Sequence, residues 1–297
     1  MKNRVAVVIS CYNHEPFIKE CINSVKGQTY KDFTIHFWDN NSTDGSFKEA
    51  FKHLIPEASI SDFGLKKVLP IGIARWLMVT EVPAQYSHIA ILDADDQWGK
   101  YKLERQMPLF DDPEVKMVFS DCYYLHWRKE TVQVGGFPAF TTEKIYTRVK
   151  GTFHEKYPPK SGDVFFDLLY GDRFGIAGHN FMPCPTLVFD RKALMDVIGN
   201  PMHYTSAEDY DWCLKMTAKY KCAYAKEPLA YYRIHDTQIT QKTPARCTAE
   251  EIDVVRTAMH YRLLTSRQKR KVYRHLLWLY AKLIYKEVQG LKNERNS

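Results

Sequence analysis

A short apolar run followed directly by three aspartates is the feature of this sequence that most constrains its fold. Residues 88–98 read HIAILDADDQW, and Ile89–Leu92 predicts a strand that is buried on both faces. Asp93, Asp95 and Asp96 follow where that strand must end, and open α/β sheets bind their ligands at the carboxyl ends of strands. On an extended backbone, Asp93 and Asp95 point to the same side. The stretch therefore predicts an α/β sheet with an acidic, ligand-binding edge.

Aspartates placed this close together repel one another unless a cation or a polar ligand lies between them. Carboxylate oxygens with open positions suit Mg²⁺ or Mn²⁺ that carries a substrate phosphate. The alternative is that these acids simply cap the loop after the strand. The stretch by itself leaves both interpretations open.

The composition fits a soluble globular protein with one large domain, or one domain with an appendage. Of the 297 residues, 45% are hydrophobic and 26% are charged. The seven cysteines are scattered and form no Cys-x-x-Cys pair, so we expect free thiols in a reducing compartment. No apolar run reaches the roughly 18 residues of a membrane span, and the N-terminus shows no cleavable signal pattern. We therefore expect a cytoplasmic protein.

The net charge of +7 is concentrated at the C-terminal end of the chain. Residues 256–297 carry 11 Lys and Arg against 2 Asp and Glu, so the rest of the chain is slightly acidic. A basic body is the electrostatic requirement for binding nucleic acid. The sequence therefore predicts no nucleic-acid partner.

Two further strand ends place polar residues at the same predicted edge. Arg4–Ser10 predicts a first strand, and Asn13 is expected to cap the helix that follows, with Glu15 in its first turn. Phe33–Trp38 predicts a second strand that runs into the polar loop Asp39–Ser46. Because the strands are expected to be parallel, their polar ends face the same edge as the three aspartates.

The next segment predicts a third strand at Val68–Ile71 and a helix over Gly72–Val82. No Gly-x-Gly-x-x-Gly follows any of these strands, which excludes a dinucleotide-dependent dehydrogenase. A phosphatase of the Asp-x-Asp class is excluded as well, because its motif follows the first strand, whereas Asp93 and Asp95 follow a later one.

Four motifs in this order resemble the family 2 glycosyltransferases of bacterial polysaccharide synthesis. They are VVISCYN at 7–13, SVKGQTY at 24–30, DNNSTDGS at 39–46 and LDADD at 92–96. The resemblance covers about Arg4–His235. It implies a GT-A fold, which is a Rossmann-like mixed sheet flanked by helices, together with a nucleoside-diphosphate sugar donor and Mn²⁺ or Mg²⁺ as cofactor.

The same resemblance implies a three-part organisation of the chain. Residues 1–122 would form the nucleotide-sugar-binding half and residues 123–240 the acceptor-binding half. Residues 241–297 lie beyond the resemblance and predict a basic helical extension.

The resemblance places the nucleobase between Tyr12 and Asp39. Tyr12 would lie against the face of the base, and the Asp39 carboxylate would accept a hydrogen bond from a ring N–H, which favours uracil or thymine. The alternatives are that Tyr12 is an aromatic residue at the edge of the core and that Asp39 forms an Asx turn.

The resemblance also assigns roles around the metal and the donor sugar. Asp95 would bind the metal, Asp93 would hold the ribose or orient the metal, and Asp96 would support the metal ligand or touch the sugar. His235, in YYRIH at 231–235, would complete the metal shell or contact the diphosphate; the alternative is an ordinary surface histidine. The remaining residues expected to bind the donor are Asn13, Glu15 and Arg75.

The stretch TSAEDYDWCL at 205–214 opens a helix and carries two further acids. The resemblance implies that Asp209 is the general base that takes a proton from the acceptor hydroxyl, with Glu208 in support. The alternative is structural, because Thr205-x-x-Glu208 is a capping box and acids favour the first turn of a helix.

The region between residues 123 and 183 is broken by glycine and proline and is expected to recognise the acceptor. Its aromatic side chains would stack on sugars or belong to the core; they are Phe153, Tyr157, Phe165, Phe166 and Tyr170.

The C-terminal extension predicts two helices. A capping box at Thr248–Glu251 would open the first and Ser266 the second, and residues 267–295 form a basic amphipathic helix with Trp278 and Tyr280. Three interpretations stay open: a helix on an anionic membrane surface, a helical hairpin packed on the catalytic domain, and a homodimer contact. The first would make the protein peripheral to the inner face of the plasma membrane.

The sequence thus predicts an inverting, metal-dependent glycosyltransferase of the hexosyltransferase class. It would move a sugar, from a UDP-sugar in particular, to a hydroxyl of a glycan or lipid-linked acceptor in surface polysaccharide synthesis. The alternative is a non-catalytic, membrane-associated scaffold that keeps the fold.

Overall fold

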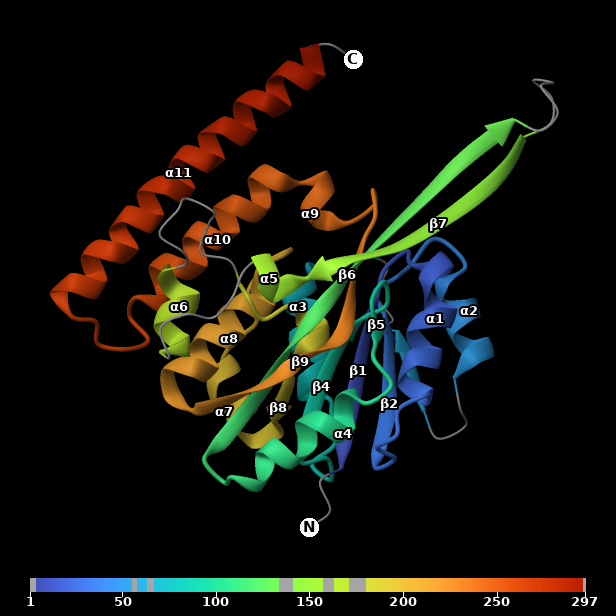
Figure 1. Cartoon of the computed structure of the whole chain (residues 1–297), viewed down its shortest axis with the longest axis horizontal. Helices are drawn as coiled ribbons and strands as arrows, with labels where there is room; N and C mark the ends of the chain where they lie inside the picture. Colours follow the sequence, from blue (N-terminus) through green and yellow to red (C-terminus); the bar gives the residue numbers. More distant parts are fainter. Residues whose placement is uncertain are drawn as a thin grey trace.

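The protein is a mixed sheet with helices on both faces (Figure 1). The computed structural model describes residues 4–54, 58–62, 67–133, 141–156, 163–170 and 180–295. Within them the strand order is β3-β2-β1-β4-β8-β6-β9-β5, and β7 pairs with β6. This is the layered α/β arrangement that the sequence predicts.

The N-terminal part of the sheet is parallel. Its strands are β1 (Val5–Cys11), β2 (Phe33–Asp39), β3 (Ser59–Asp62) and β4 (His88–Asp93). Every residue of β1 is buried, because helices cover both faces of the strand. The carboxyl ends of these strands meet at one edge, as predicted.

Alternate residues of β1 contribute to two separate hydrophobic cores. Val7 and Ile9 face the core on the side of α1 (Glu15–Lys26), α2 (Ser46–His53) and α4 (Lys102–Gln106). Ala6 and Val8 face the larger core on the other side. That side is covered by α3 (Ile71–Thr80), α6 (Val164–Tyr170), α7 (Arg191–Ile198) and α8 (Glu208–Lys219).

The second part of the sheet mixes directions. Its strands are β5 (Gln97–Trp98), β6 (Val115–Gln133), β7 (Thr141–Thr152), β8 (Val188–Asp190) and β9 (Lys221–Ile234). β6 is parallel to β9, and with β7 it forms a long antiparallel hairpin that projects from the body (Figure 1). Short helical segments connect these strands: η1 (Met107–Asp111), α5 (Phe153–Lys156) and η2 (Cys184–Thr186).

Two of the aromatic residues proposed as sugar-stacking candidates belong to the core instead. Phe165 and Phe166 are buried among the helices of the larger core. Tyr157 and the side chains of Phe153 and Tyr170 lie outside the described parts of the structure.

The C-terminal extension is helical and packs on the catalytic body. It consists of α9 (Ile239–Lys242), α10 (Pro244–Ala258) and α11 (Ser266–Arg295). Val255 of α10 and Leu279 of α11 are part of the larger core, and α11 runs back along α10 (Figure 1). Among the described helices, none combines the length and the apolar character that crossing a membrane requires.

The predicted strand at Val68–Ile71 is wrong. The third strand is β3, and Leu69 is bound instead by the side chain of Asn40. The Asn40 amide donates to the Leu69 carbonyl at 2.8 Å, and its Oδ1 accepts from the Leu69 N–H at 3.0 Å. These are the two backbone groups that a neighbouring strand would otherwise bind, so the segment stays outside the sheet.

Neither of the two capping boxes forms. Thr205 does not cap α8, because its backbone N–H and hydroxyl donate to Glu250, and α8 begins only at Glu208. Glu251, the acid of the second box, pairs with Lys282 instead, and α10 already begins at Pro244, so Thr248 lies inside the helix.

Asn13 does not cap α1 either. His14 holds the N-cap position, and Asn13, whose backbone is left-handed (φ 56°), accepts with its side-chain oxygen from the Thr43 N–H instead. The predicted boundary between residues 122 and 123 falls inside β6, and the three-part division of the chain stays a prediction.

Candidate active site

The polar side chains that the sequence predicts as functional gather at the carboxyl edge of the parallel strands. Asp39 is the last residue of β2, and Asp93 is the last residue of β4. His14 follows β1 and begins α1, while His235 follows β9 from much later in the chain. Parallel strands bring these distant segments together at one edge, which is where α/β sheets bind ligands.

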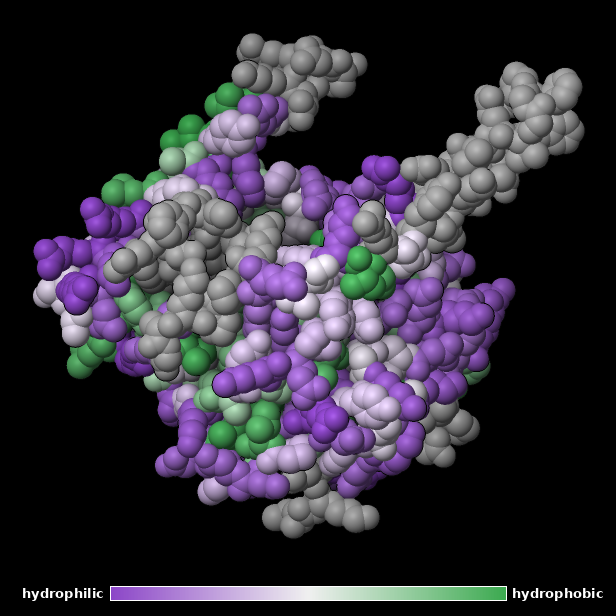
Figure 2. Space-filling model, viewed as in Figure 1, coloured by the Kyte–Doolittle hydropathy of each residue, from purple (hydrophilic) through white to green (hydrophobic). Residues whose placement is uncertain are grey.

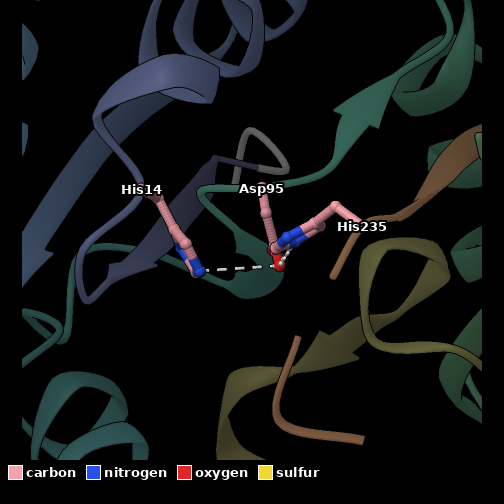
Figure 3. A group of neighbouring side chains, drawn as sticks. All are labelled: His14, Asp95 and His235. Carbon is pink, nitrogen blue, oxygen red and sulfur yellow. Dashed lines mark hydrogen bonds and ion pairs between the residues drawn. The ribbon is translucent and has the colours of Figure 1, made fainter. Parts of the chain in front are cut away.

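Asp95 lies between two histidine rings at this edge, and Figure 3 shows the three side chains pointing toward one another. Its Oδ2 atom is 3.1 Å from Nε2 of His235 and 3.6 Å from Nε2 of His14. The Nδ1 atom of His235 lies 2.7 Å from the Thr237 hydroxyl, which fixes the orientation of the ring. His14 was not among the residues predicted from the sequence.

This group of three side chains fits a divalent metal ion. One ligand atom from each of His14, Asp95 and His235 lies within 4.8 Å of the others, and the same holds for Asp93, Asp95 and Asp96. Imidazole nitrogens favour transition metals, whereas Mg²⁺ prefers oxygen ligands. The mixed donor set therefore suits an ion such as Mn²⁺ better than Mg²⁺.

Asp95 and Asp96 are neighbours with opposite electrostatic environments. Burial raises the pKa of Asp95, but His14 and the hydrogen bond with His235 outweigh it and hold that pKa at about 2. Burial and the charges of Asp95 and Asp93 raise the pKa of Asp96 well above its usual range. Asp95 is therefore the ionised member of the pair, and its carboxylate is the one suited to a cation.

Asp96 faces the protein interior. Its side chain is 2% exposed, and its Oδ1 accepts a hydrogen bond of 2.8 Å from the backbone N–H of Arg233. The buried Arg233 guanidinium also donates to the carbonyl of Asp95 at 2.6 Å and to Glu20 at 2.7 Å. β9 thus holds the acidic loop in place, and this favours the supporting role for Asp96 over contact with the sugar.

Arg75 joins the acidic loop to the start of α8. Its guanidinium donates to the carboxylates of both Asp93 and Glu208, and Asp93 also accepts from the Ser10 hydroxyl at 2.5 Å. Arg75 is only 3% exposed. Arg75 therefore links the two acids inside the protein. Its buried guanidinium is not accessible to a donor diphosphate.

Asp209 lies in the first turn of α8, beside this bridge. Its Oδ2 accepts a hydrogen bond of 3.3 Å from the Asn180 amide, a residue that the sequence did not indicate. Burial, followed by the neighbouring Glu208 carboxylate, raises the pKa of Asp209 to about 7. A carboxylate with a pKa near neutrality is suited to accept and release a proton.

Tyr12 and Asp39 differ in how far they are available to a ligand. The Tyr12 side chain is 41% exposed, so it is not the core aromatic residue that was the alternative. Both oxygens of Asp39 accept hydrogen bonds from Ser42, from the backbone N–H at 2.8 Å and from the hydroxyl at 2.6 Å. Asp39 therefore forms the Asx-type turn, and its contact with a base stays a prediction.

Asn13 and Glu15 bind the loop after β2. The Asn13 side-chain oxygen accepts from the Thr43 N–H at 2.7 Å, and a Glu15 carboxylate oxygen accepts from the Gly45 N–H at 3.1 Å. The two residues thus connect the loops after β1 and β2, while Tyr12 beside them stays exposed. Their expected role in donor binding stays a prediction.

A cavity of about 540 Å³ lies at the base of the β6–β7 hairpin. Its lining mixes aromatic, charged and hydroxyl groups: Tyr124, His126, Lys150, Gly151, Thr152, Glu155 and Ile234. One of its lining residues, Ile234, directly precedes His235 in the sequence.

The family model for Glycosyl transferase family 2 matches residues 6–153 of this chain. Among curated proteins, the chain is similar to the UDP-Glc:alpha-D-GlcNAc-diphosphoundecaprenol beta-1,3-glucosyltransferase WfaP of Escherichia coli. The identity is 25% over 232 residues, which cover 78% of this chain and 77% of the relative.

Solved structures show the same fold at low sequence identity. Staphylococcus aureus TarS 1-349 in complex with UDP-GlcNAc matches with a TM-score of 0.63 and 16% identity, covering 94% of this chain and 73% of the other. Glucosyl-3-phosphoglycerate synthase of Mycobacterium tuberculosis, in complex with Mn²⁺, UDP and phosphoglyceric acid, matches with a TM-score of 0.54 and 13% identity, covering 89% and 81%. These likenesses confirm the predicted GT-A fold.

Proposed function

The chain belongs to glycosyl transferase family 2, and on that premise we propose that it transfers a hexose from a UDP-sugar to a hydroxyl of a glycan or lipid-linked acceptor, with inversion at the anomeric carbon. WfaP, whose name states a UDP-glucose donor and a diphosphoundecaprenol-linked acceptor, supports this choice of substrates. We further propose a role in surface polysaccharide synthesis on the cytoplasmic side.

The observation that carries the proposal is the position of Asp95 between two imidazoles at the carboxyl end of β4, 3.1 Å and 3.6 Å away. His14, Asp95 and His235 would hold the divalent cation, Mn²⁺ in preference to Mg²⁺. When bound, such an ion neutralises the charge that develops on a departing diphosphate. The exposed ring of Tyr12 lies on the neighbouring loop, where it would cover the nucleobase.

Asp209 would act as the general base. Its carboxylate removes the proton from the acceptor hydroxyl, and the resulting oxygen nucleophile attacks the anomeric carbon from the side opposite the diphosphate. One displacement of this kind inverts the anomeric configuration. Asn180 and Arg75 hold this end of the site: Asn180 donates to Asp209 directly, and Arg75 fixes the adjacent Glu208.

The acceptor would approach from the cavity at the base of the hairpin. Its mixture of hydroxyl, carboxylate, amine and aromatic side chains matches a ligand that both donates and accepts hydrogen bonds, as a sugar does. A glycan end bound in this cavity would supply the acceptor hydroxyl.

A donor panel tests the proposal. The purified protein is incubated with UDP-glucose, UDP-GlcNAc and UDP-galactose, with Mn²⁺ and a lipid extract that contains polyprenyl-diphosphate glycans, and released UDP is measured. We expect Mn²⁺-dependent UDP release with at least one donor, and none after addition of EDTA. No UDP release from any of these donors would overturn the proposed UDP-sugar donor. If GDP- and dTDP-sugars added to the same assay also release no nucleotide, the non-catalytic scaffold remains.

A further inference from the structure

The last helix, α11, presents two faces of very different character. Its inner face packs on the body: Val272, Leu276 and Leu279 are buried in the larger core. Lys282 pairs with Glu251 of α10 at 3.1 Å, and Lys286 donates to the Thr248 hydroxyl at 2.8 Å. The position and orientation of α11 are therefore fixed by one face alone.

The outer face of α11 carries an apolar stripe, which Figure 2 shows as green side chains along the outer edge of the helix. The stripe consists of Tyr273, Leu277, Tyr280, Ile284, Tyr285, Val288 and Leu291, all of them exposed. Leu277 and Ile284 are 70% and 62% exposed. A row of exposed apolar side chains, unlike single scattered ones, is typical of a surface that contacts a protein or a membrane. Leu277, Ile284 and Leu291 recur every seven residues, so they share one side of the helix.

Exposed cations cluster at the N-terminal end of the same helix. They are Arg267, Lys269, Arg270 and Arg274, which we call the basic end of α11. Glu287 is the only acidic residue among the described side chains of α11. A helix with an apolar face, flanking cations and tyrosines has the character of helices that lie in the interface of an anionic membrane.

The charge distribution argues against a second copy of the chain as the occupant. Two α11 helices paired in parallel through the stripe would bring their basic ends together. Paired antiparallel, each basic end would meet a segment whose described side chains offer only Glu287. Anionic headgroups, in contrast, complement the basic end while the lipid tails cover the stripe.

We propose that the outer face of α11 docks the protein on a bilayer that contains anionic phospholipids. The helix lies in the plane of the surface, with the stripe inserted below the headgroups and the basic end among them. The stripe spans 19 residues from Tyr273 to Leu291, which is about 27 Å of helix in contact with the surface. Docking of this kind goes beyond the proposed transfer reaction and does not depend on it, since α11 contributes no residue to the acidic site.

Vesicle flotation with the full chain tests this inference. Wild type is compared on phosphatidylcholine vesicles and on vesicles with 30% phosphatidylglycerol, at about 0.15 M salt. The stripe variant is Leu277→Gln, Ile284→Gln and Leu291→Gln together. The matched control is Phe47→Gln with Phe51→Gln, which removes exposed apolar residues from α2.

Wild type and the α2 control are expected to bind the anionic vesicles. The stripe variant should bind them at least ~100-fold more weakly, because three large apolar groups stay in water. A variant with Arg267, Arg270 and Arg274 changed to Gln should lose the preference for phosphatidylglycerol. All these positions are exposed, and circular dichroism will verify that the variants fold.

Three results would overturn the inference. Wild type that stays off anionic vesicles shows that no such docking occurs. Equal binding by wild type and the stripe variant shows adsorption by charge alone. A dimer that dissociates in the stripe variant, without vesicle binding by wild type, identifies a second copy as the occupant. UDP titration of the same variants keeps these outcomes separate from a failure of the donor site.

Discussion

Two acidic groups lie at the same edge of the sheet and differ sharply in their surroundings. Around Asp95, two histidine rings face the carboxylate, and its pKa is held at about 2. Around Asp209, burial and a neighbouring glutamate raise the pKa to about 7. One carboxylate is therefore permanently ionised at neutral pH, while the other exchanges its proton there.

The difference would allow one edge to divide two tasks between chemically identical side chains. An ionised carboxylate between imidazoles is suited to a cation, and a carboxylate that titrates near neutrality is suited to proton transfer. Arg75 lies between them and pairs with one acid of each group, Asp93 and Glu208. The arrangement predicts that the two groups fail in different ways when altered.

Loss of Asp95 should have the largest effect. Asp95→Ala removes the carboxylate between the two imidazoles, so we expect Mn²⁺ binding to disappear and transfer to fall by about 10³-fold or more. Electron paramagnetic resonance of free Mn²⁺ measures the binding. Glu114→Ala, an exposed acid at the other edge of the sheet, is the control and should bind Mn²⁺ as wild type does. Undiminished Mn²⁺ binding by Asp95→Ala would remove Asp95 from the metal site.

Loss of Asp209 should slow the chemical step and leave donor binding unchanged. Asp209→Asn keeps the shape of the side chain but not its basicity, so we expect kcat to fall by about 10²- to 10⁴-fold. UDP release from the active donor in the presence of acceptor measures this fall. Asp112→Asn, at an exposed position before β6, serves as the control. Normal turnover by Asp209→Asn would disqualify Asp209 as the base.

Removal of the bridge between the groups should act on stability. Arg75→Met leaves Asp93 and Glu208 without their buried partner, and we expect the free energy of unfolding to drop by about 3–5 kcal/mol. Urea denaturation of Arg75→Met and of Arg105→Met, whose guanidinium is exposed, measures the difference. Equal stability of the two variants would mean that the bridge contributes little to folding.

His14 should affect the choice of metal. His14→Gln removes one imidazole of the donor set, so we expect Mn²⁺ affinity to fall about tenfold while Mg²⁺ affinity changes little. Competition between the two ions, followed by Mn²⁺ resonance, gives both values. His260→Gln changes an exposed histidine and is the control. An unchanged ratio of the two affinities would place His14 outside the coordination shell.

The raised pKa of Asp209 predicts how the rate depends on pH. The base must be ionised to act, so activity should rise with pH through about 7 and be roughly tenfold lower at pH 6 than at pH 8. Equal rates at pH 6 and pH 8, measured at saturating donor and Mn²⁺, would contradict a base with this pKa.

Local sequence patterns were sufficient for the parallel strands β1, β2 and β4 and for their acidic edge. Asp93, Asp95 and Asp96 lie within four consecutive positions at the end of a buried run, so their position at the sheet edge could be predicted directly. The strand at Val68–Ile71 was predicted wrongly because the Asn40 side chain takes the backbone hydrogen bonds there, and side-chain competition of this kind leaves no periodic signal.

The sequence could not predict the contacts between residues that lie far apart in the chain. His14 joins Asp95 across about 80 residues, and the Arg75–Glu208 pair spans 133. His14 follows the predicted first strand, so its position at the functional edge was the available signal. The separation of the Asp95 and Asp209 pKa values depends on burial and neighbours, which only the folded arrangement specifies.

Titration of UDP into three proteins in the presence of Mn²⁺ tests the division of tasks most directly. Isothermal calorimetry is run on wild type, Asp95→Ala and Asp209→Asn, each with and without the metal. We expect Mn²⁺-dependent UDP binding by wild type and Asp209→Asn with similar affinity, and none by Asp95→Ala. Loss of UDP binding in Asp209→Asn, or its retention in Asp95→Ala, would contradict the separation of a metal-binding group from a proton-accepting group.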